Sequence, residues 1–335
     1  MTAVWSWLDD DLRRAVSAGL AGGWDTGAAL PAAGGAGRSC CRPGRFFAHS
    51  ACAFICYHGR PLIFSRLLLP RLPGVVVPLP DSNTASIVCA ANPLREIYRD
   101  QWLLVVHKPA GLLLHRSPID RHETEFALQY ARALNGGEHV YPVHRLDRPT
   151  SGLLVFARNP ETASILGKAL MAGEVSKTYL ALVRGWAPEV GEIDHPLREQ
   201  ATDRRCKDEP QPLREAFTRY RRLATTEIPV MIERYPASRY SLVALYPQTG
   251  RKHQLRRHMQ HISHPIIGDT NYGRTRHNHY FAERFGGSRL MLAATGMRFR
   301  HPVTTEPLEL YAAPEASFMQ VLSIFTEPLP SFAEL

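Results

Sequence analysis

The feature that most constrains the fold of this chain is a series of short apolar runs. Polar segments and Gly- or Pro-containing segments of different lengths lie between them. Three of the runs, 102–107, 153–157 and 177–184, have the length and composition of strands. In 239–246 apolar and polar side chains alternate, which is typical of a strand with one buried face. Helical segments separate only some of these strands, so the chain has no regular strand–helix–strand rhythm. The pattern predicts an α+β fold with a central mixed, mostly antiparallel sheet flanked by helices and loops.

Helices are predicted where helically spaced apolar residues end at Gly or Pro, which gives 124–134, 160–172 and a segment from 249 to Pro265. Further strands are predicted at 216–223, 266–267, 290–294 and 296–301. Residues 198–212 are charged and interrupted by prolines, and they are predicted to form a loop.

Residues 1–92 differ in character from the rest of the chain. Gly, Ala, Pro and Arg cluster there, and prolines interrupt the apolar runs before any periodicity develops. We interpret this part as a flexible extension, or as sequence upstream of the true translation start. A folded domain is predicted over 93–335.

Charge and cysteine usage restrict the class of protein. The formal net charge is +9, which favours an anionic partner such as nucleic acid, although a merely basic soluble enzyme fits equally well. Five of the six cysteines precede residue 93 and none forms a CxxC pair, so reduced thiols are expected. No apolar run approaches the roughly 20 residues that span a bilayer. Together with acidic residues near the N-terminus, this predicts a cytoplasmic protein without membrane association.

The segment 144–152, with the sequence HRLDRPTSG, is the most distinctive polar stretch. Asp147 lies between Arg145 and Arg148, and nearby opposite charges favour the ionised carboxylate. Pro149 has a fixed φ and lacks an N–H, which places Asp147 in a turn or at a strand end. Taken alone, such a cluster is more often a solvated surface turn.

Three polar clusters accompany the apolar strands: Asp147 with Arg145 and Arg148; Lys177 with Tyr179; and Arg251, His253, Gln254, Arg256, Arg257 and His258. Arg and Lys bind phosphates, and aromatic rings stack on unpaired bases. A carboxylate in such a field can act as a nucleophile or a base. Each cluster alone is weak, because a basic helix face is usually solvated and a tyrosine in a strand is usually part of the core.

Together the clusters resemble the motifs of the RluA-type pseudouridine synthases. The segments 144–152, 177–179 and 249–256 match three motifs of that family in order, and the turns at 108–111 and 268–269 also fit. The resemblance runs from about residue 94 to 310, so 93–335 would be the catalytic domain. Further segments, among them 184–186 and 234–236, resemble the branch of the family that modifies uridine-65 of tRNA. One departure is Ala293, where the family usually has His.

The resemblance implies an isomerase that converts an RNA uridine to pseudouridine without a cofactor or metal. Asp147 would be the catalytic aspartate, attacking C1′ or removing a proton from C2′ of a flipped-out nucleotide. Tyr179 would contact the uracil and serve as base for the C5 proton, and Arg256 would pair with Asp147. RNA would be bound by Arg145, His144, Arg148, Lys177, Arg251, His253 and Gln254. The partner would be RNA, tRNA in particular, and the enzyme a monomer.

Three other functions fit parts of the sequence. An enzyme of the same family could modify ribosomal RNA instead. An RNA-binding protein without catalysis would use the same basic face. A metallo-hydrolase is suggested by His258, His261 and His264, but on a helix the first and last of these diverge too far to face one ion.

Overall fold

The computed structural model describes residues 92–116, 122–199 and 211–332. The predicted extension and most of the loop at 198–212 therefore lie outside the described residues. The strands of the main sheet are β1 (Arg95–Arg99), β2 (Leu103–Lys108), β3 (Tyr141–Pro142), β4 (Ser151–Ala157), β5 (Ser176–Arg184), β6 (Val190–Asp194), β9 (Phe217–Ile228), β10 (Ser238–Pro247), β11 (Leu292–Arg300) and β12 (Pro307–Tyr311). Strands β7 (Leu197–Arg198) and β8 (Leu213–Arg214) form a separate pair. The described helices are α2 (Ala127–Leu134), α3 (Pro160–Ala172), α4 (Gln254–His261), α5 (Thr275–Phe285) and α6 (Ala316–Leu322).

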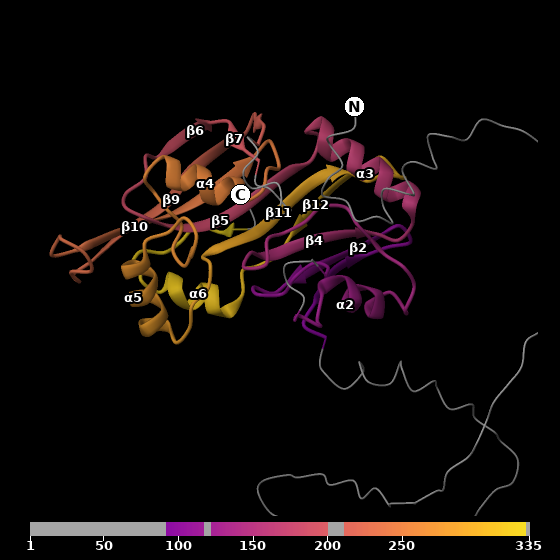
Figure 1. Cartoon of the computed structure of the whole chain (residues 1–335). Helices are drawn as coiled ribbons and strands as arrows, with labels where there is room; N and C mark the ends of the chain where they lie inside the picture. The colour runs from indigo at the N-terminus through magenta and orange to yellow at the C-terminus, as the bar shows by residue number, and fades with distance from the viewer. Residues whose placement is uncertain (1–91, 117–121, 200–210, 333–335) are drawn as a thin grey trace, which may run out of the picture. The chain divides into compact units, whose positions relative to one another are not determined.

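The sheet has the strand order β1-β2-β4-β11-β5-β10-β9-β6, with β3 added to β4 and β12 to β11 (Figure 1). Of the strand pairs that the structure describes, only β4–β11 is parallel, through Ala293 opposite Ser151 and Ala294 opposite Gly152. The predicted α+β class with a mixed, mostly antiparallel sheet is confirmed. The parallel contact places the start of β4 beside the middle of the sheet, where β11 also pairs with β5.

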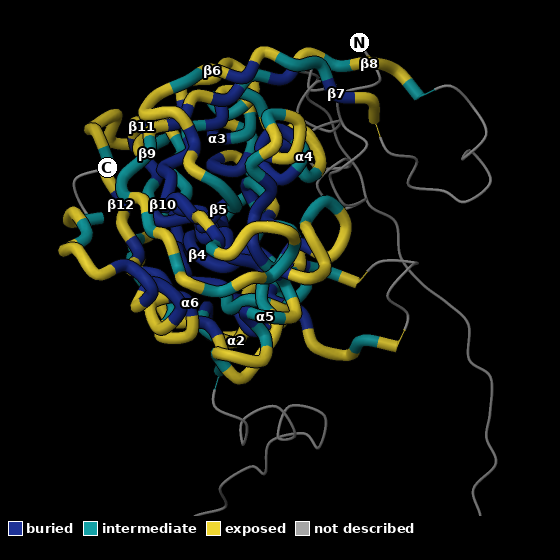
Figure 2. Tube along the Cα trace, turned by 90° about the vertical axis from the view of Figure 1, so that its left-hand side faces the viewer, coloured by how far each residue is buried: buried dark blue, intermediate teal, exposed yellow. Residues whose placement is uncertain are grey.

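Both faces of the sheet are covered. Alternate residues of β2 and β4 pack against α3 on one face, through Leu103 and Leu153, and against α2 on the other, through Leu104 and Leu154. Beyond β11, strands β5 and β10 pack with residues of α4, α5 and α6. Figure 2 shows the buried residues concentrated along the central strands, with exposed positions mainly in the connections. No described helix has the length and apolar character that crossing a membrane requires.

Local signals explain the helix that matched its prediction fully. Helix α3 begins after Asn159, whose side chain accepts a hydrogen bond from the backbone N–H of Thr162, with Pro160 in the first turn. It ends at Gly173, which has a φ of 77°. Both are standard helix boundaries, so the sequence alone locates this helix.

Elsewhere the observed elements differ from the predicted ones, because contacts between distant parts of the chain decide them. The segments 290–294 and 296–301 form the single strand β11, because the chain passes Thr295 with a register shift against β5 instead of breaking. The strand predicted at 266–267 is only an isolated bridge between Ile266 and Val183. The helix predicted from residue 249 begins at Gln254, since His253 before it has a φ of 55°. Helices α5 and α6 were not predicted.

Candidate active site

Asp147 lies in the turn between β3 and β4. The turn is closed by a 3.0 Å hydrogen bond from the N–H of Thr150 to the carbonyl of Asp147. Leu146 is buried in the core beside α2, which anchors the turn from one side. The Asp147 side chain is 20% exposed, so it opens to solvent while its backbone is fixed. A reactive group held this way is accessible to a substrate.

Lys108, at the end of β2, ties the Asp147 turn to the neighbouring turn. Its ammonium group is fully buried and donates hydrogen bonds to the carbonyls of Pro109, Leu112 and Arg148, at 2.9, 2.8 and 3.2 Å. Burial lowers the pKa of Lys108 to about 7, although the charges of Glu315 and Asp147 act in the opposite direction. This lysine therefore serves as a cross-link between two turns.

Gly152 explains how β4 can approach the centre of the sheet. Its φ is 112°, and a Cβ atom added there would lie 2.0 Å from the carbonyl oxygen of Ala294. Any other residue would clash with the backbone of β11. Because Ala294 also pairs with Tyr179 of β5, this close contact brings the Asp147 strand near that tyrosine.

Arg256 approaches Asp147 from α4. Its side chain is 4% exposed, and Nη1 lies 3.5 Å from Oδ2 of Asp147. His253, immediately before α4, has Nε2 3.9 Å from the same oxygen and Nδ1 3.1 Å from the hydroxyl of Tyr272. Burial lowers the pKa of His253 despite the nearby charge of Asp147. Arg256 is thus the permanent cation at this carboxylate, and the contact between them is long.

Asp269 is a second carboxylate at this arginine. It accepts hydrogen bonds from Nε and Nη2 of Arg256, at 2.7 and 2.8 Å, and is almost completely buried. The sequence drew attention to the turn at 268–269 but assigned no function to Asp269. Nothing in the chain's local pattern indicates that this carboxylate contacts Arg256.

Tyr179 lies on β5 and packs against the core on both sides of β11. Burial, together with the negative charge of Asp147, raises its pKa well above the usual range of a tyrosine. Tyr179 is therefore a neutral phenol at neutral pH.

The other residues predicted around the motif differ in their surroundings. Arg145 is exposed, next to Asp147. His144 accepts a 3.2 Å hydrogen bond from the N–H of Val155, and burial lowers its pKa to about 4. Arg148 donates to the carbonyl of Gly111 and to Glu123, at 3.1 and 2.6 Å. His144 and Arg148 therefore hold the turn, whereas Arg145 is directed to solvent.

The remaining predicted RNA-binding residues also differ in burial and in hydrogen bonding. Arg251 is exposed and donates to the carbonyl of Glu215 at 3.0 Å. Gln254 is buried, and its amide is bonded to the backbone carbonyl of Phe217 and to two threonine hydroxyls. Lys177 is partly buried, and burial lowers its pKa. Gln254 has no side-chain group left for a ligand, so its contacts are those of a structural residue.

The histidines that suggested a metal site are engaged separately. His258 is buried between the Thr218 hydroxyl and the carbonyl of His195, at 3.0 and 3.1 Å. The ring of His261 stacks on that of His195, with centroids 3.7 Å apart. His264 pairs with the carbonyl of Arg184 at 2.9 Å. Among the described residues no group of three His, Cys, Asp or Glu side chains is arranged to hold a metal ion.

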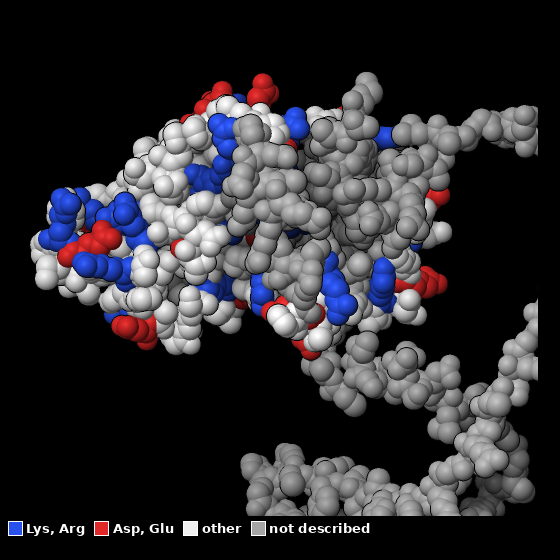
Figure 3. Space-filling model, viewed as in Figure 1, with Lys and Arg blue, Asp and Glu red and all other residues white. Residues whose placement is uncertain are grey.

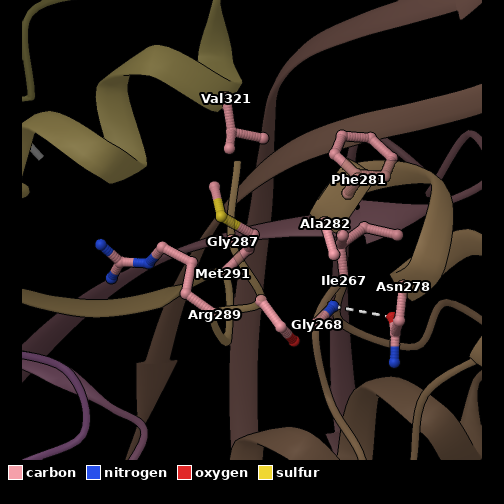
Figure 4. A pocket seen from close by; sticks show the side chains of 10 residues that line it. Ile267, Gly268, Asn278, Phe281, Ala282, Gly287, Arg289, Met291 and Val321 are labelled. Atoms are coloured by element: carbon pink, nitrogen blue, oxygen red, sulfur yellow. Dashed lines mark hydrogen bonds between the residues drawn. The ribbon is translucent and has the colours of Figure 1, made fainter. Parts of the chain in front are cut away.

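At one end of the described surface, basic and acidic side chains lie close together. Lys and Arg side chains gather at the end of the β9–β10 hairpin, interspersed with acidic side chains (Figure 3). Two of these acidic residues pair with arginines, Glu227 with Arg239 at 2.5 Å and Glu233 with Arg184 at 3.0 Å. A small pocket behind the Asp269 turn, lined by Ile267, Asn278 and Met291 among others, includes neither Asp147 nor Tyr179 (Figure 4).

Known proteins match this chain in sequence and in fold. The family model described as RNA pseudouridylate synthase matches residues 102–261. The tRNA pseudouridine synthase C of Pasteurella multocida is 46% identical over 241 residues, covering 71% of this chain and 98% of the relative. Relatives of the same name from Vibrio cholerae and Yersinia pestis are 46% and 47% identical, each over 69% of this chain and over 96% and 91% of their own lengths.

Two solved structures share the fold. Human RNA Pseudouridylate Synthase Domain Containing 1 superposes with a TM-score of 0.52 at 25% identity, covering 72% of this chain and 99% of the other. Human RNA Pseudouridylate Synthase Domain Containing 4 gives a TM-score of 0.53 at 24% identity, covering 68% and 92%. The family resemblance found in the motifs is confirmed. This chain therefore belongs to the RNA pseudouridylate synthase family and is an RNA pseudouridine synthase, an isomerase.

Proposed function

We propose that this enzyme isomerises one uridine of tRNA, uridine-65, to pseudouridine, with Asp147 as the catalytic residue. The observation that carries the assignment of the site is the Asp147 carboxylate, 3.5 Å from the buried Arg256. Strand β4, which follows Asp147, pairs through Gly152 with Ala294, and Ala294 also pairs with Tyr179. The choice of tRNA is supported by relatives named tRNA pseudouridine synthase C, which this chain covers almost completely. Uridine-65 rests on the motif resemblance described above.

The reaction rearranges bonds within one nucleotide. The N1–C1′ bond breaks, the uracil turns, and C5 forms a new bond to C1′. In one route a carboxylate oxygen of Asp147 bonds to C1′ as N1 leaves, and is displaced again by C5. In the other route Asp147 removes a proton from C2′ and later returns it. In both, the proton on C5 is lost and one is gained at N1, so the product is an isomer of the substrate.

The surrounding residues have distinct proposed roles. Arg256 keeps the Asp147 carboxylate ionised and oriented, since an opposite charge favours the charged form. Tyr179 packs against the uracil ring and takes part in removing the C5 proton. Because its phenol is neutral, its oxygen can accept that proton only as its own proton leaves. Arg145 is exposed beside Asp147 and would fill the space left by the flipped nucleotide.

Affinity for RNA is proposed to come from the exposed cations Arg145 and Arg251, through phosphate contacts. Lys177 and His253 are partly buried at the edge of the site and are proposed to contact the bound nucleotide. His144, Arg148 and Gln254 are proposed to support the site from behind, because their side chains are bonded within the protein. We further propose that the enzyme acts in the cytoplasm as a monomer, with residues 93–335 as its catalytic domain.

Incubation with defined RNAs tests the proposed function. Purified enzyme is incubated with unmodified bulk tRNA and, separately, with unmodified ribosomal RNA, and pseudouridine is then mapped chemically. We expect one new pseudouridine in tRNA, at position 65. Modification of ribosomal RNA alone would favour the other branch of the family, and binding of either RNA without modification would indicate a non-catalytic protein.

A further inference from the structure

Arg256 is shared unequally between two carboxylates. Its Nε and Nη2 atoms donate to Oδ2 and Oδ1 of Asp269, at 2.7 and 2.8 Å, in a two-pronged arrangement. Such parallel hydrogen bonds are strong and fix the plane of the guanidinium. Only Nη1 faces Asp147, at 3.5 Å. The buried carboxylate therefore holds Arg256 tightly, and the accessible carboxylate only loosely.

Asp269 is itself held firmly. Its Oδ1 accepts hydrogen bonds from the backbone N–H groups of Asn271 and Tyr272, at 2.9 and 3.0 Å. Asn278 of α5 bonds to both sides of the turn, accepting from the N–H of Gly268 and donating to the carbonyl of Asp269, each at 2.8 Å. Figure 4 shows the first of these bonds. The Asp269 carboxylate is a rigid reference point for Arg256.

Asp269 is also ionised in spite of its burial. Burial opposes ionisation of Asp269, but the hydrogen bond and charge of Arg256 and the two backbone N–H groups together lower its pKa. Asp269 is thus anionic and forms an ion pair with Arg256. Without Asp269, Nη2 of Arg256 could donate to Asp147 together with Nη1, and the two side chains would form a tight ion pair.

We propose that Asp269 is a positioning residue for the isomerisation: it fixes Arg256 so that only Nη1 reaches Asp147, which leaves the Asp147 carboxylate oriented but free to react. The inference rests on the proposed function, and deepens it by adding a residue that acts through Arg256. Asp269 does not touch the substrate, because its side chain is 1% exposed.

The substitution Asp269→Asn separates this role from the role in the turn. Asparagine keeps an Oδ1 acceptor for the backbone N–H groups, but places an NH₂ donor opposite Nε of Arg256. We expect kcat on tRNA to fall at least ~10-fold and up to ~100-fold, the range for a misplaced catalytic group. KM and the Kd for tRNA should stay within about twofold, because phosphate contacts supply most of the affinity.

A double-mutant cycle shows whether Asp269 acts through Arg256. If it does, Asp269→Asn should change single-turnover rates by less than about twofold in an Arg256→Gln background, because coupled residues are not additive. Full, multiplicative losses in the double variant would overturn the proposal. The variant Asp269→Glu keeps the charge but displaces Arg256, and should give a kcat between those of the wild type and Asp269→Asn. It replaces Asp269→Asn in the cycle if that variant does not fold.

Asp100→Asn is the matched control, since Asp100 also bonds two backbone N–H groups and one basic side chain. We expect it to lower the melting temperature and leave kcat within about twofold. The proposal fails if Asp269→Asn behaves like this control. A wild-type enzyme inactive on every RNA would instead overturn the proposed function, so the two failures are distinguishable.

Discussion

Two carboxylates near the opposite ends of strand β2, Asp100 and Asp147, differ in how strongly they are hydrogen-bonded. Before the N-terminal end of β2, Asp100 accepts hydrogen bonds on Oδ1 from the N–H groups of Trp102 and Leu103, at 2.7 and 2.6 Å. Its Oδ2 accepts from the hydroxyl of Tyr98 at 2.7 Å and lies 2.9 Å from Nε2 of His301. Each oxygen of Asp100 thus has two hydrogen-bonding partners. The carboxylate connects the start of β2 to Tyr98 of β1 and to His301 after β11.

At the C-terminal end of β2, Lys108 holds the turn that carries Asp147. The Asp147 carboxylate has the same exposed fraction as that of Asp100, 20%, but its nearest described cation is Arg256 at 3.5 Å. Strong hydrogen bonds at this end go to the backbone of the turn and to Asp269, not to the exposed carboxylate. Similar exposure with different bonding therefore distinguishes the structural carboxylate of Asp100 from the proposed catalytic carboxylate of Asp147.

Among substitutions that test this difference between the two carboxylates, Asp147→Asn should have the largest effect on kcat. The amide can neither attack C1′ nor accept the C2′ proton, so kcat should fall by ~10⁴-fold or more, as for other catalytic groups. The Kd for tRNA should remain within about threefold. Single-turnover formation of pseudouridine and filter binding measure the two quantities. A variant with wild-type turnover would show that Asp147 is not the catalytic residue.

Tyr179→Phe tests the second residue of the site. The ring is retained and the hydroxyl removed, so we expect tRNA binding within about threefold and a kcat ~10²-fold lower, within the range of general acid–base catalysis. Mapping the rate of C5 proton release with C5-tritiated uridine in the tRNA follows the step directly. Loss of binding instead of turnover would indicate a structural role for Tyr179.

Asp100→Asn is expected to act on stability instead of turnover. Removing a charged acceptor with several partners should cost about 1.5–3 kcal/mol in the free energy of unfolding at neutral pH. Burial tends to raise the pKa of Asp100, but its hydrogen bonds from Tyr98, the backbone and His301 lower it overall. Because the folded-state pKa is depressed, this contribution is present above the usual aspartate pKa and lost as the pH falls below it.

Urea unfolding at pH 7 and at decreasing acidic pH measures the effect of Asp100→Asn. The difference between wild type and variant should be full at pH 7 and narrow as Asp100 becomes protonated. A difference that does not depend on pH, or a loss of turnover without a loss of stability, would remove the distinction between the two ends of β2.

Arg251→Gln should give the smallest effect. Arg251 is exposed on the approach to α4 and is proposed to contact a phosphate. Removing one such contact should weaken binding of all RNAs similarly and reduce the slope of log K against log salt by up to about one. Binding titrations across a range of salt concentrations measure the slope. An unchanged slope would place Arg251 outside the RNA path.

The sequence located most local elements because local physics decides them. Helix α3 carries its own capping residues, and β5 and β10 show their strand character in composition and alternation. Helix α5 has no side-chain cap and carries several polar residues between its apolar ones, so no local signal predicts it. Strand β11 was divided at Thr295 because a bulge against β5 is a property of the pairing, which no local pattern reveals.

The motifs by themselves determined the family and the candidates Asp147, Tyr179 and Arg256, and the order of the apolar segments determined the α+β class. Tertiary structure decided how those candidates relate to their neighbours. The parallel contact of β4 with β11, possible only because Gly152 lacks a Cβ, brings the Asp147 turn close to Tyr179. The two-pronged bond between Arg256 and Asp269 joins a helix to the turn that follows it. Residue types specify which chemistry is possible, whereas distance and direction between charges decide which carboxylate is held and which is free to react.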